Sequence, residues 1–465
     1  MKDTLNRFHN LVEKLLQDEH KNPVSKPIPA QKLFEQIDLS LPEKAIDDDT
    51  FYPLLEKVVL AAPKTATRAF FNQLFGGRNE KAVLGELLSV ILNNSMYTYK
   101  AAGVMIGVEK AIINQILEIL GWDSDHSGGT FAAGGSMTNF MAMLMARDKV
   151  GDEVPTLGVR QNMTVYTSKE SHYSIPKNAT FAGLGRDSVR YIETDDEGRM
   201  MPDHLENTIK EDIEEGFLPV LINATAGTTV LGAFDPISPL IKIRDTYAMW
   251  LHVDGAYCGS VIFSEKYRHL VKGVEQVDSF SVNAHKMLGT PLSSSLVFVK
   301  DKKHLYNSFS NDANYLYQTD HDEFNLGKIS LQCGRRNDAL KFWTLWKQVG
   351  TEGLEEMVDK QFALADVARD YIREHADDYT LYSFDDSIGI CFNYKDYPAK
   401  DICTLLYEKA TLMVGYGRFR QDEFIRLVTI NAQNEKEDIL NFFTTLESFV
   451  AEHEEELREM ALPVQ

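Results

Sequence analysis

The sequence has no long apolar segment. Although 44% of its 465 residues are hydrophobic, no apolar run reaches the roughly 20 residues that a helix needs to cross a bilayer. The first twenty residues carry charges throughout, unlike the apolar centre of a secretory signal. We therefore expect no membrane span, no membrane anchor and no signal peptide.

Cysteine is also scarce. The four cysteines, Cys258, Cys333, Cys391 and Cys403, form no CxxC pair and follow no disulfide-framework spacing. This pattern argues against a small disulfide-stapled fold and favours reduced thiols in the cytoplasm. No metal site is predicted.

Positive charge is low, with 48 Lys and Arg against 69 Asp and Glu and a net charge of −21. Nucleic acids and anionic membranes are bound by basic surfaces, so neither is an expected partner. Solubility is the simplest explanation of the excess. A small acidic substrate remains compatible with this net charge, because a few buried arginines can make the electrostatic potential of a binding site positive.

The chain is long enough for two or three domains. Its first twenty residues repeat apolar side chains at helical spacing, and a proline-rich arm, NPVSKPIPA, follows them. We expect an N-terminal helical segment and arm over 1–60, a large domain over 61–345 and a small α+β domain over 346–465.

The large domain alternates short apolar strands with helices. The strands are MTVYTS, LPVLINA, MWLHVD, SFSVN and SLVFV, with helices over 139–149 and 203–215. This order predicts an α/β fold with a mainly parallel central sheet flanked by helices. Functional groups then lie beyond the carboxyl ends of strands. In the small domain we predict strands at TLYSF, GICFNYK and FIRLVTI, and helices over 398–412 and 434–456.

Two charged residues follow consecutive predicted strands. Asp254 ends the strand in WLHVDGAY, and Lys286 follows the next one in SVNAHKMLG. Alone, Asp254 could cap a helix and Lys286 could be solvated. Together they are typical of a site for pyridoxal phosphate (PLP). A carboxylate keeps the pyridine ring protonated, and a partly buried amine attacks the aldehyde.

Three weaker signals gain weight beside this pair. The glycine pair at 134–135 precedes a helix that opens with Ser136 and Met137, where a phosphate could bind, although ordinary helix caps look similar. His172, in SKESHYSIPK, could be structural or could stack on a cofactor ring. Arg426, in FIRLVTI, needs an anionic partner, either an internal carboxylate or a bound one.

These segments together resemble the group II PLP-dependent decarboxylases of fold type I, in the glutamate, cysteine sulfinate and aspartate decarboxylase branch. The resemblance runs from about Arg68 to the C-terminus. It includes FFNQL, MYTY, GGS with Asn139, SHYSIPK, NATAGTTVLGAFDPI, HKM, QCGRR with Asp338, and VGY. It implies a PLP-dependent carboxy-lyase that forms a homodimer with active sites at the subunit interface.

The resemblance also implies the cofactor contacts. Lys286 would bind PLP as a Schiff base, Asp254 would pair with the ring nitrogen, and His172 would stack on the ring. Further contacts would come from Gly135, Ser136, Met137, Thr225, Ala256, Asn283 and His285.

Other matching positions imply substrate contacts. Gln73 and Arg426 would bind a substrate carboxylate. Tyr315 would protonate the α-carbon after CO2 leaves, so its replacement by Phe should favour side reactions over clean amine release.

The substrate is expected to be a small acidic L-amino acid. Phe75, Ser95 and Tyr97 resemble the cysteine sulfinate and aspartate decarboxylases, because a phenyl ring at position 75 would shorten the pocket. One methylene gives only about 1–3 kcal/mol of discrimination, so L-glutamate remains an alternative substrate.

Two further alternatives concern the reaction itself. The chain could be a fold type I enzyme of another class, such as an aminotransferase, which a CO2-release assay would reveal. It could also be a cofactor-free scaffold, which PLP could not reconstitute.

Overall fold

The computed structural model describes residues 1–151, 153–310 and 321–461. The chain divides into two compact units. The large unit comprises 78–363 and 383–389, and the small unit comprises 1–77, 364–382 and 390–465. Among the described residues, no helix has both the length and the apolar character needed to cross a membrane.

The large unit is built on a seven-stranded sheet in the order β1-β7-β6-β5-β4-β2-β3. The strands are β1 (Gly128–Ala132), β2 (Met163–Ser168), β3 (Val189–Ile192), β4 (Leu218–Thr225), β5 (Trp250–Gly255), β6 (Ser279–Asn283) and β7 (Ser295–Val299). Strand β7 pairs antiparallel with β1 and β6, whereas β2 to β6 run parallel. The predicted mainly parallel sheet is confirmed.

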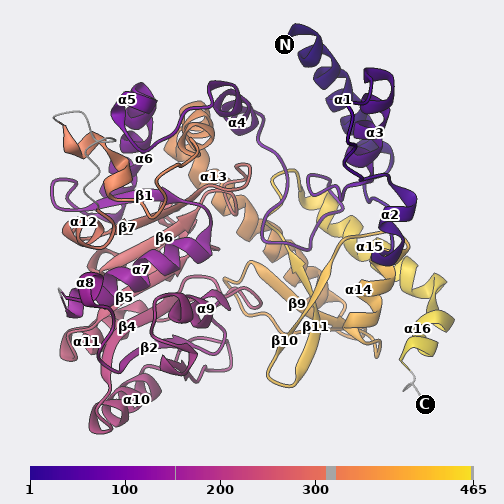
Figure 1. Cartoon of the computed structure of the whole chain (residues 1–465). Coiled ribbons are helices and arrows are strands. Elements are labelled where there is room, and N and C mark those ends of the chain that lie inside the picture. Colours follow the sequence, from indigo (N-terminus) through magenta and orange to yellow (C-terminus); the bar gives the residue numbers. More distant parts are fainter. Residues whose placement is uncertain (152, 311–320, 462–465) are drawn as a thin grey trace. The chain divides into compact units, whose positions relative to one another are not determined.

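The helices of the large unit include α4 (Glu80–Leu92), α5 (Tyr99–Ala102), α6 (Val104–Leu120), α7 (Gly135–Val150), α8 (Val154–Leu157), α9 (Ser174–Phe181), α10 (Pro202–Glu214), α11 (Ile237–Thr246) and α12 (Lys303–Phe309). Of these, α6, α7, α9, α10 and α11 contact strands of the sheet. Helix α7 lies across the sheet and contacts β1 and β4 to β7 (Figure 1). Every residue of β5, β6 and β7 is buried, so both faces of the sheet are covered there.

The small unit has a four-stranded sheet in the order β10-β11-β9-β8. Its strands are β8 (Tyr379–Leu381), β9 (Gly389–Tyr394), β10 (Gly415–Phe419) and β11 (Asp422–Val428). Its helices are α1 (Lys2–Lys21), α2 (Leu33–Gln36), α3 (Asp48–Ala61), α14 (Ala399–Glu408), α15 (Lys436–Glu452) and α16 (Glu454–Met460). Helix α13 (Ala339–Glu374) connects the units along the chain and breaks at Gly350, where φ is 71°.

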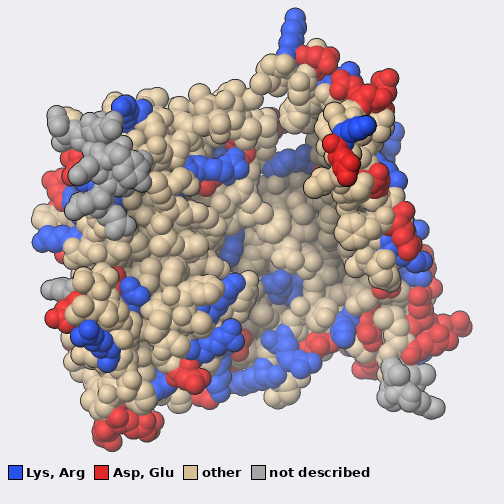
Figure 2. Space-filling view, viewed as in Figure 1, with Lys and Arg blue, Asp and Glu red and all other residues tan. Residues whose placement is uncertain are grey.

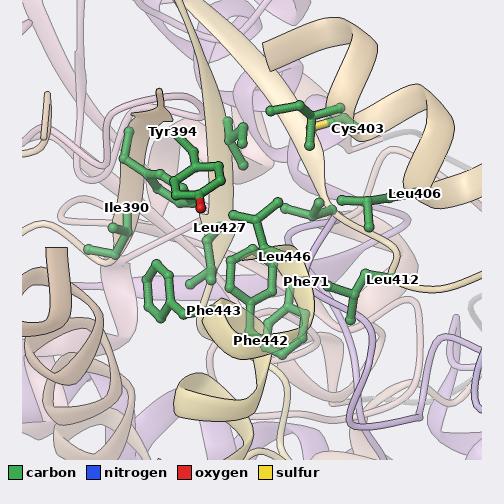
Figure 3. Packing of buried hydrophobic residues seen from close by; sticks show 14 of the residues in the cluster. Phe71, Ile390, Tyr394, Cys403, Leu406, Leu412, Leu427, Phe442, Phe443 and Leu446 are labelled. Carbon is green, nitrogen blue, oxygen red and sulfur yellow. The ribbon is translucent and has the colours of Figure 1, made fainter. Parts of the chain in front are cut away.

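The core of the small unit is rich in aromatic side chains. Phe442 and Phe443 of α15 pack with Leu427 of β11 and Phe71 (Figure 3). The rings of Phe71 and Phe442 meet edge to face, with centroids 5.1 Å apart. Such pairs add about 0.5–1.5 kcal/mol to the free energy of area burial.

Residues before position 78 join this unit through backbone pairing. The Phe71 amide donates to the Met413 carbonyl at 2.8 Å, and the Val428 amide donates to the Phe71 carbonyl at 3.1 Å. Buried Lys64 pairs with Asp18 of α1. Residues 1–77 are thus grouped with the C-terminal residues in the small unit. The three-domain boundaries stay a prediction.

Acidic and basic side chains are interspersed on the face of the molecule shown in Figure 2.

Candidate active site

All of the predicted cofactor residues except Met137 line one cavity of the large unit, with a volume of about 190 Å³. It is lined by Gly135, Ser136, Asn139, His172, Tyr173, Thr225, Gly227, Thr229, Asp254, Ala256, Tyr257, Asn283, His285 and Lys286. Strands β4, β5 and β6 end at this cavity, and His172 follows β2. The shared direction of these strands explains why residues distant in sequence converge at one edge.

Asp254 lies near the end of β5 and is 3% exposed. Its Oδ2 accepts a hydrogen bond from Asn139 Nδ2 at 2.7 Å, and its Oδ1 accepts one from the Ala256 amide at 3.1 Å. Asp254 therefore does not cap the following helical turn, which begins at Gly259. Both oxygens of the side chain thus accept hydrogen bonds from within the large unit, which fixes the orientation of the carboxyl group.

Lys286 follows β6 in a turn in which its amide donates to the Asn283 carbonyl at 3.1 Å. Its side chain is half-buried, and Nζ lies 5.8 Å from the ring centroid of Tyr257. Lys286 and Asp254 line the same cavity. An amine and a carboxylate thus face one enclosed space.

His172 is half-buried, and burial is the main cause that lowers the pKa of its imidazole. The Lys286 cation lowers this pKa further, while the Asp254 anion opposes the shift. The Ser174 amide donates to His172 Nδ1 at 3.2 Å. The neutral ring therefore carries its hydrogen on Nε2.

Asn283 lies next to Gly135, and His285 lines the same cavity. His285 Nδ1 lies 2.9 Å from the Ser294 amide nitrogen and 3.1 Å from the Ser294 carbonyl oxygen, so the backbone of Ser294 holds the imidazole in place. A Cβ at Gly135 would come 2.9 Å from Ala256 Cβ and 3.0 Å from Asn283 Nδ2. Glycine is therefore required where α7 begins against the cavity.

Two buried polar atoms indicate that the cavity fits PLP. Within the described residues, Thr225 Oγ1 and Asn283 Oδ1 have no hydrogen-bond partner, and both residues line the cavity. Buried polar atoms without partners are costly. A ring hydroxyl could pair with Thr225 Oγ1, and the Asn283 amide could turn over to present its NH2 group to a phosphate. The amine of Lys286 and the anion of Asp254 match the aldehyde and the ring nitrogen of PLP.

His285 also predicts how stability depends on pH. Burial lowers its pKa to about 3, below the ordinary value near 6.5. The unfolded chain therefore binds the proton first, and the protein loses stability as pH falls from about 6.5 towards 3. At pH 5 this one group should cost about 2 kcal/mol.

Thermal unfolding of the cofactor-free protein between pH 8 and pH 5 tests this. His285→Asn should unfold with a shallower dependence on pH than the wild type. The same substitution at exposed His20 should leave the dependence unchanged. Equal slopes for His285→Asn and wild type would contradict the assignment.

Three predicted substrate residues belong to the small unit. Arg426, in β11, is half-buried, and its Nη2 donates to the Asn72 carbonyl at 2.8 Å. Gln73 is exposed and follows Asn72 directly. The Phe75 ring packs against Phe70, with centroids 6.1 Å apart. The hydrogen bonds that Phe71 and Asn72 accept from Val428 and Arg426 of β11 thus bring Gln73 and Arg426 into one region of this unit.

Ser95 and Tyr97 belong to the large unit but do not line its cavity. The Arg335 amide donates to Ser95 Oγ at 3.2 Å, and the Gly327 amide donates to the Tyr97 carbonyl at 2.8 Å. The segment that carries both is therefore held against 327–335.

Met137, which the resemblance also implies as a cofactor contact, does not line the cavity. Met137 packs into the core beneath α7, and its amide donates to the Gly134 carbonyl at 2.9 Å. Its phosphate contact stays a prediction. Tyr315 lies outside the described residues.

The sequence assigned no individual role to Asn139, Ser174 or His252. All three are buried. Asn139 is hydrogen-bonded to Asp254, and Ser174 is hydrogen-bonded to His172. Ser174 and His252 each also contact Asn139. The segment WLHVD could have indicated a role for His252, because His252 and Asp254 occupy alternate positions of an apolar strand and thus face the same side of the sheet.

Known proteins with similar sequences point to the same chemistry. A model of the pyridoxal-dependent decarboxylase conserved domain matches residues 30–395. Acidic amino acid decarboxylase GADL1 of Mus musculus is 35% identical over 435 residues, which cover 88% of this chain and 78% of GADL1. Cysteine sulfinic acid decarboxylase of Homo sapiens is 36% identical over 368 residues, which cover 78% of this chain and 74% of that enzyme.

Solved structures agree. The crystal structure of mouse CSAD matches with a TM-score of 0.89 at 31% identity, covering 95% of this chain and 98% of that chain. Oryza sativa TDC, crystallised with PLP and tryptamine, matches with a TM-score of 0.88 at 23% identity, covering 97% of this chain and 98% of that chain, and so shows the fold alone. The chain therefore belongs to the pyridoxal-dependent decarboxylase family and is a PLP-dependent amino acid decarboxylase.

Proposed function

We propose that this enzyme removes the α-carboxylate of a small acidic L-amino acid, converting L-aspartate to β-alanine, L-cysteine sulfinate to hypotaurine, or both. The observation that carries the proposal is the convergence of Lys286, Asp254 and His172 on one cavity. Support for an acidic substrate comes from half-buried Arg426 and from relatives named for acidic amino acids and cysteine sulfinate.

The proposed roles follow from the chemistry of these residues. PLP, when bound, supplies an electron sink for the pair of electrons left by CO2. The Lys286 amine would hold the cofactor aldehyde and yield to the substrate amine. The Asp254 anion would hold a proton on the ring nitrogen, and His172 would cover the ring face. His285, Asn283, Ser136 and the Gly135 region would bind the phosphate.

Arg426 would bind the second carboxylate or sulfinate of the substrate. A guanidinium presents planar paired donors that suit such an anion. Its hydrogen bond to the Asn72 carbonyl limits the orientations of its side chain. Gln73 would add a donor beside it.

Phe75 should set the length of the pocket. Phe75→Ser is expected to raise the kcat/KM for glutamate relative to aspartate by roughly 10-fold to 200-fold, because the pocket gains room for about one methylene. CO2 release from aspartate, cysteine sulfinate, glutamate and tryptophan should be compared side by side. Phe34→Ser, at a 79% exposed phenylalanine of the same unit, should leave the ratio unchanged.

The same assay separates the alternatives. A wild-type preference for glutamate would favour γ-aminobutyrate formation, and an unchanged ratio in Phe75→Ser would remove Phe75 from the pocket. Amino transfer without CO2 would contradict the decarboxylation proposal.

A homodimer is the proposed assembly. Helix α4 exposes a run of large apolar side chains: Leu84, Leu87, Leu88, Val90, Ile91 and Leu92. A contiguous apolar surface of this kind is typical of an interface. Light scattering should give twice the chain mass, and Ile91→Glu should shift the protein towards monomer. Ile213→Glu, at an exposed apolar residue of α10, should not, and a wild-type monomer with full activity would contradict the proposal.

The proposed location is the cytoplasm. No disulfide joins any of the four cysteines, and three of them are buried. Free thiols suit a reducing compartment.

A further inference from the structure

A row of buried polar side chains leads from the edge of the core to Asp254. Its members are Trp250, Ser279, His252, Asn139 and Asp254, none more than 3% exposed. Trp250 Nε1 donates to Ser279 Oγ at 2.7 Å, and Ser279 Oγ lies 2.8 Å from His252 Nδ1. His252 Nε2 lies 3.1 Å from Asn139 Oδ1, and Asn139 Nδ2 donates to Asp254 at 2.7 Å.

The direction of these hydrogen bonds is determined from both ends. At one end, the indole of Trp250 can only donate, so Ser279 accepts from it. Among the described residues, the only other partner of the Ser279 hydroxyl is His252 Nδ1, so its hydrogen goes to that nitrogen. At the other end, an ionised carboxylate can only accept, so the amide nitrogen of Asn139 faces Asp254 and its oxygen faces His252. His252 must then carry its hydrogen on Nε2 and accept at Nδ1.

The environment of His252 agrees with this single tautomer. Burial lowers the pKa of His252 to about 4, so the ring is neutral near pH 7. Each of the four bonds then has one donor and one acceptor, and all of them point towards Asp254. If the Asn139 amide turned over, its oxygen would face the carboxylate and its NH2 group would face the N–H of His252. Both contacts would be repulsive.

Asn139 also reaches His172. Its Nδ2 lies 3.3 Å from Ser174 Oγ, and Ser174 Oγ lies 2.8 Å from His172 Nδ1. A hydrogen bond from Asn139 to Ser174 leaves the Ser174 hydroxyl to donate to His172. The amide of Asn139 is therefore a branch point between the carboxylate and the imidazole of the site.

We propose that Trp250, Ser279 and His252 form a one-way chain of hydrogen-bond donors that locks the Asn139 amide in one orientation. This lock holds Asp254 ready for the cofactor ring nitrogen and His172 in its Nε2–H form. Trp250, Ser279 and His252 are thus positioning residues. The inference rests on the proposed function, in which Asp254 pairs with that nitrogen.

Ser279→Ala tests the chain with the smallest change of volume. The apoprotein is reconstituted with PLP labelled with 15N at the ring nitrogen. In the variant, we expect the midpoint pH for loss of the ring proton, read from the 15N signal, to fall. We also expect PLP to dissociate about threefold to tenfold more readily, the usual effect of losing one hydrogen bond.

Ser281→Ala is the matched control. Ser281 lies on the same strand, is equally buried and pairs in register with Asp254 itself, whereas Ser279 pairs with His252. Ser281 Oγ has no hydrogen-bond partner within the described residues. A general disturbance of packing would therefore affect Ser281→Ala at least as strongly, whereas loss of the chain would affect only Ser279→Ala.

A double variant tests whether the members act in series. Trp250→Phe removes the hydrogen bond that Trp250 donates to Ser279. Its effect on the 15N signal and on PLP dissociation should vanish in the Ser279→Ala background, because the effects of substitutions within one hydrogen-bond network are not additive. Thermal unfolding of each apoprotein shows whether it is folded. If Ser279→Ala proves unfolded, Trp250→Phe in the wild-type background provides the same 15N and PLP readouts.

The outcomes separate the two proposals. A wild-type 15N signal and PLP affinity in Ser279→Ala, or an equal loss in Ser281→Ala, would overturn the chain alone. A wild-type enzyme whose bound PLP carries no ring proton, or is not fixed by borohydride on Lys286, would overturn the proposed function as well.

Discussion

Lys286→Ala is expected to lower decarboxylation by at least about 10³-fold, in the range seen when a covalent catalyst is removed. The variant should also lose the absorbance of the covalently held cofactor. The physical reason is the position of the amine, which follows β6 and faces the cavity with Asp254. No other lysine lines this cavity within the described residues, so no nearby amine can replace it.

Borohydride reduction followed by peptide mapping checks this assignment. The label should lie on Lys286 in the wild type and be lost in Lys286→Ala. Lys286→Arg keeps the charge without a comparable nucleophile and should be as inactive as the alanine variant, whereas Lys272→Ala, at an exposed lysine, should be active. A label on another lysine would refute the central assignment of the site.

Asp254→Asn is expected to lower kcat by about 10²-fold to 10³-fold, the usual effect of removing one preorganised electrostatic contact. An amide cannot balance the charge of a protonated ring nitrogen, so the ring becomes a weaker electron sink. Asn139 would also lose an anionic acceptor and would face a neutral amide. Stopped-flow turnover and the 15N signal of labelled PLP measure the two effects.

Another buried carboxylate supplies the control. Asp212 of α10 accepts hydrogen bonds from Tyr166 and Arg190, is 5% exposed and does not line the cavity. Asp212→Asn should cost stability but leave the ring nitrogen protonated. If Asp254→Asn retained wild-type turnover, the pairing of Asp254 with the ring would be wrong.

Local patterns in the chain were sufficient for much of the large unit. The strands MTVYTS, LPVLINA, MWLHVD, SFSVN and SLVFV correspond to β2, β4, β5, β6 and β7, because fully buried strands form continuous apolar runs. The edge strands β1 and β3 were not predicted. In the small unit, β10 was missed because GYGRF is glycine-rich and has no buried residue.

Helix ends depended on tertiary packing that local patterns do not record. The helix predicted over 398–412 ends at Glu408, and Ala410 adopts a positive φ of 56°. The helix predicted over 434–456 is interrupted at His453, between α15 and α16. The phenylalanines of α15 are held by packing against β11 and Phe71, which no spacing rule could supply.

The sequence by itself determined the chemistry of this protein, because the residue types and their order along the chain identify an amine and a carboxylate after consecutive strands, and motifs from FFNQL to QCGRR identify the family. Only the tertiary structure decided how those groups are held. Trp250 and His252 come from β5, Ser279 from β6 and Asn139 from α7, and the direction of a hydrogen bond depends on which donor faces which acceptor. That relation exists only after the strands have paired and the helix has packed on them.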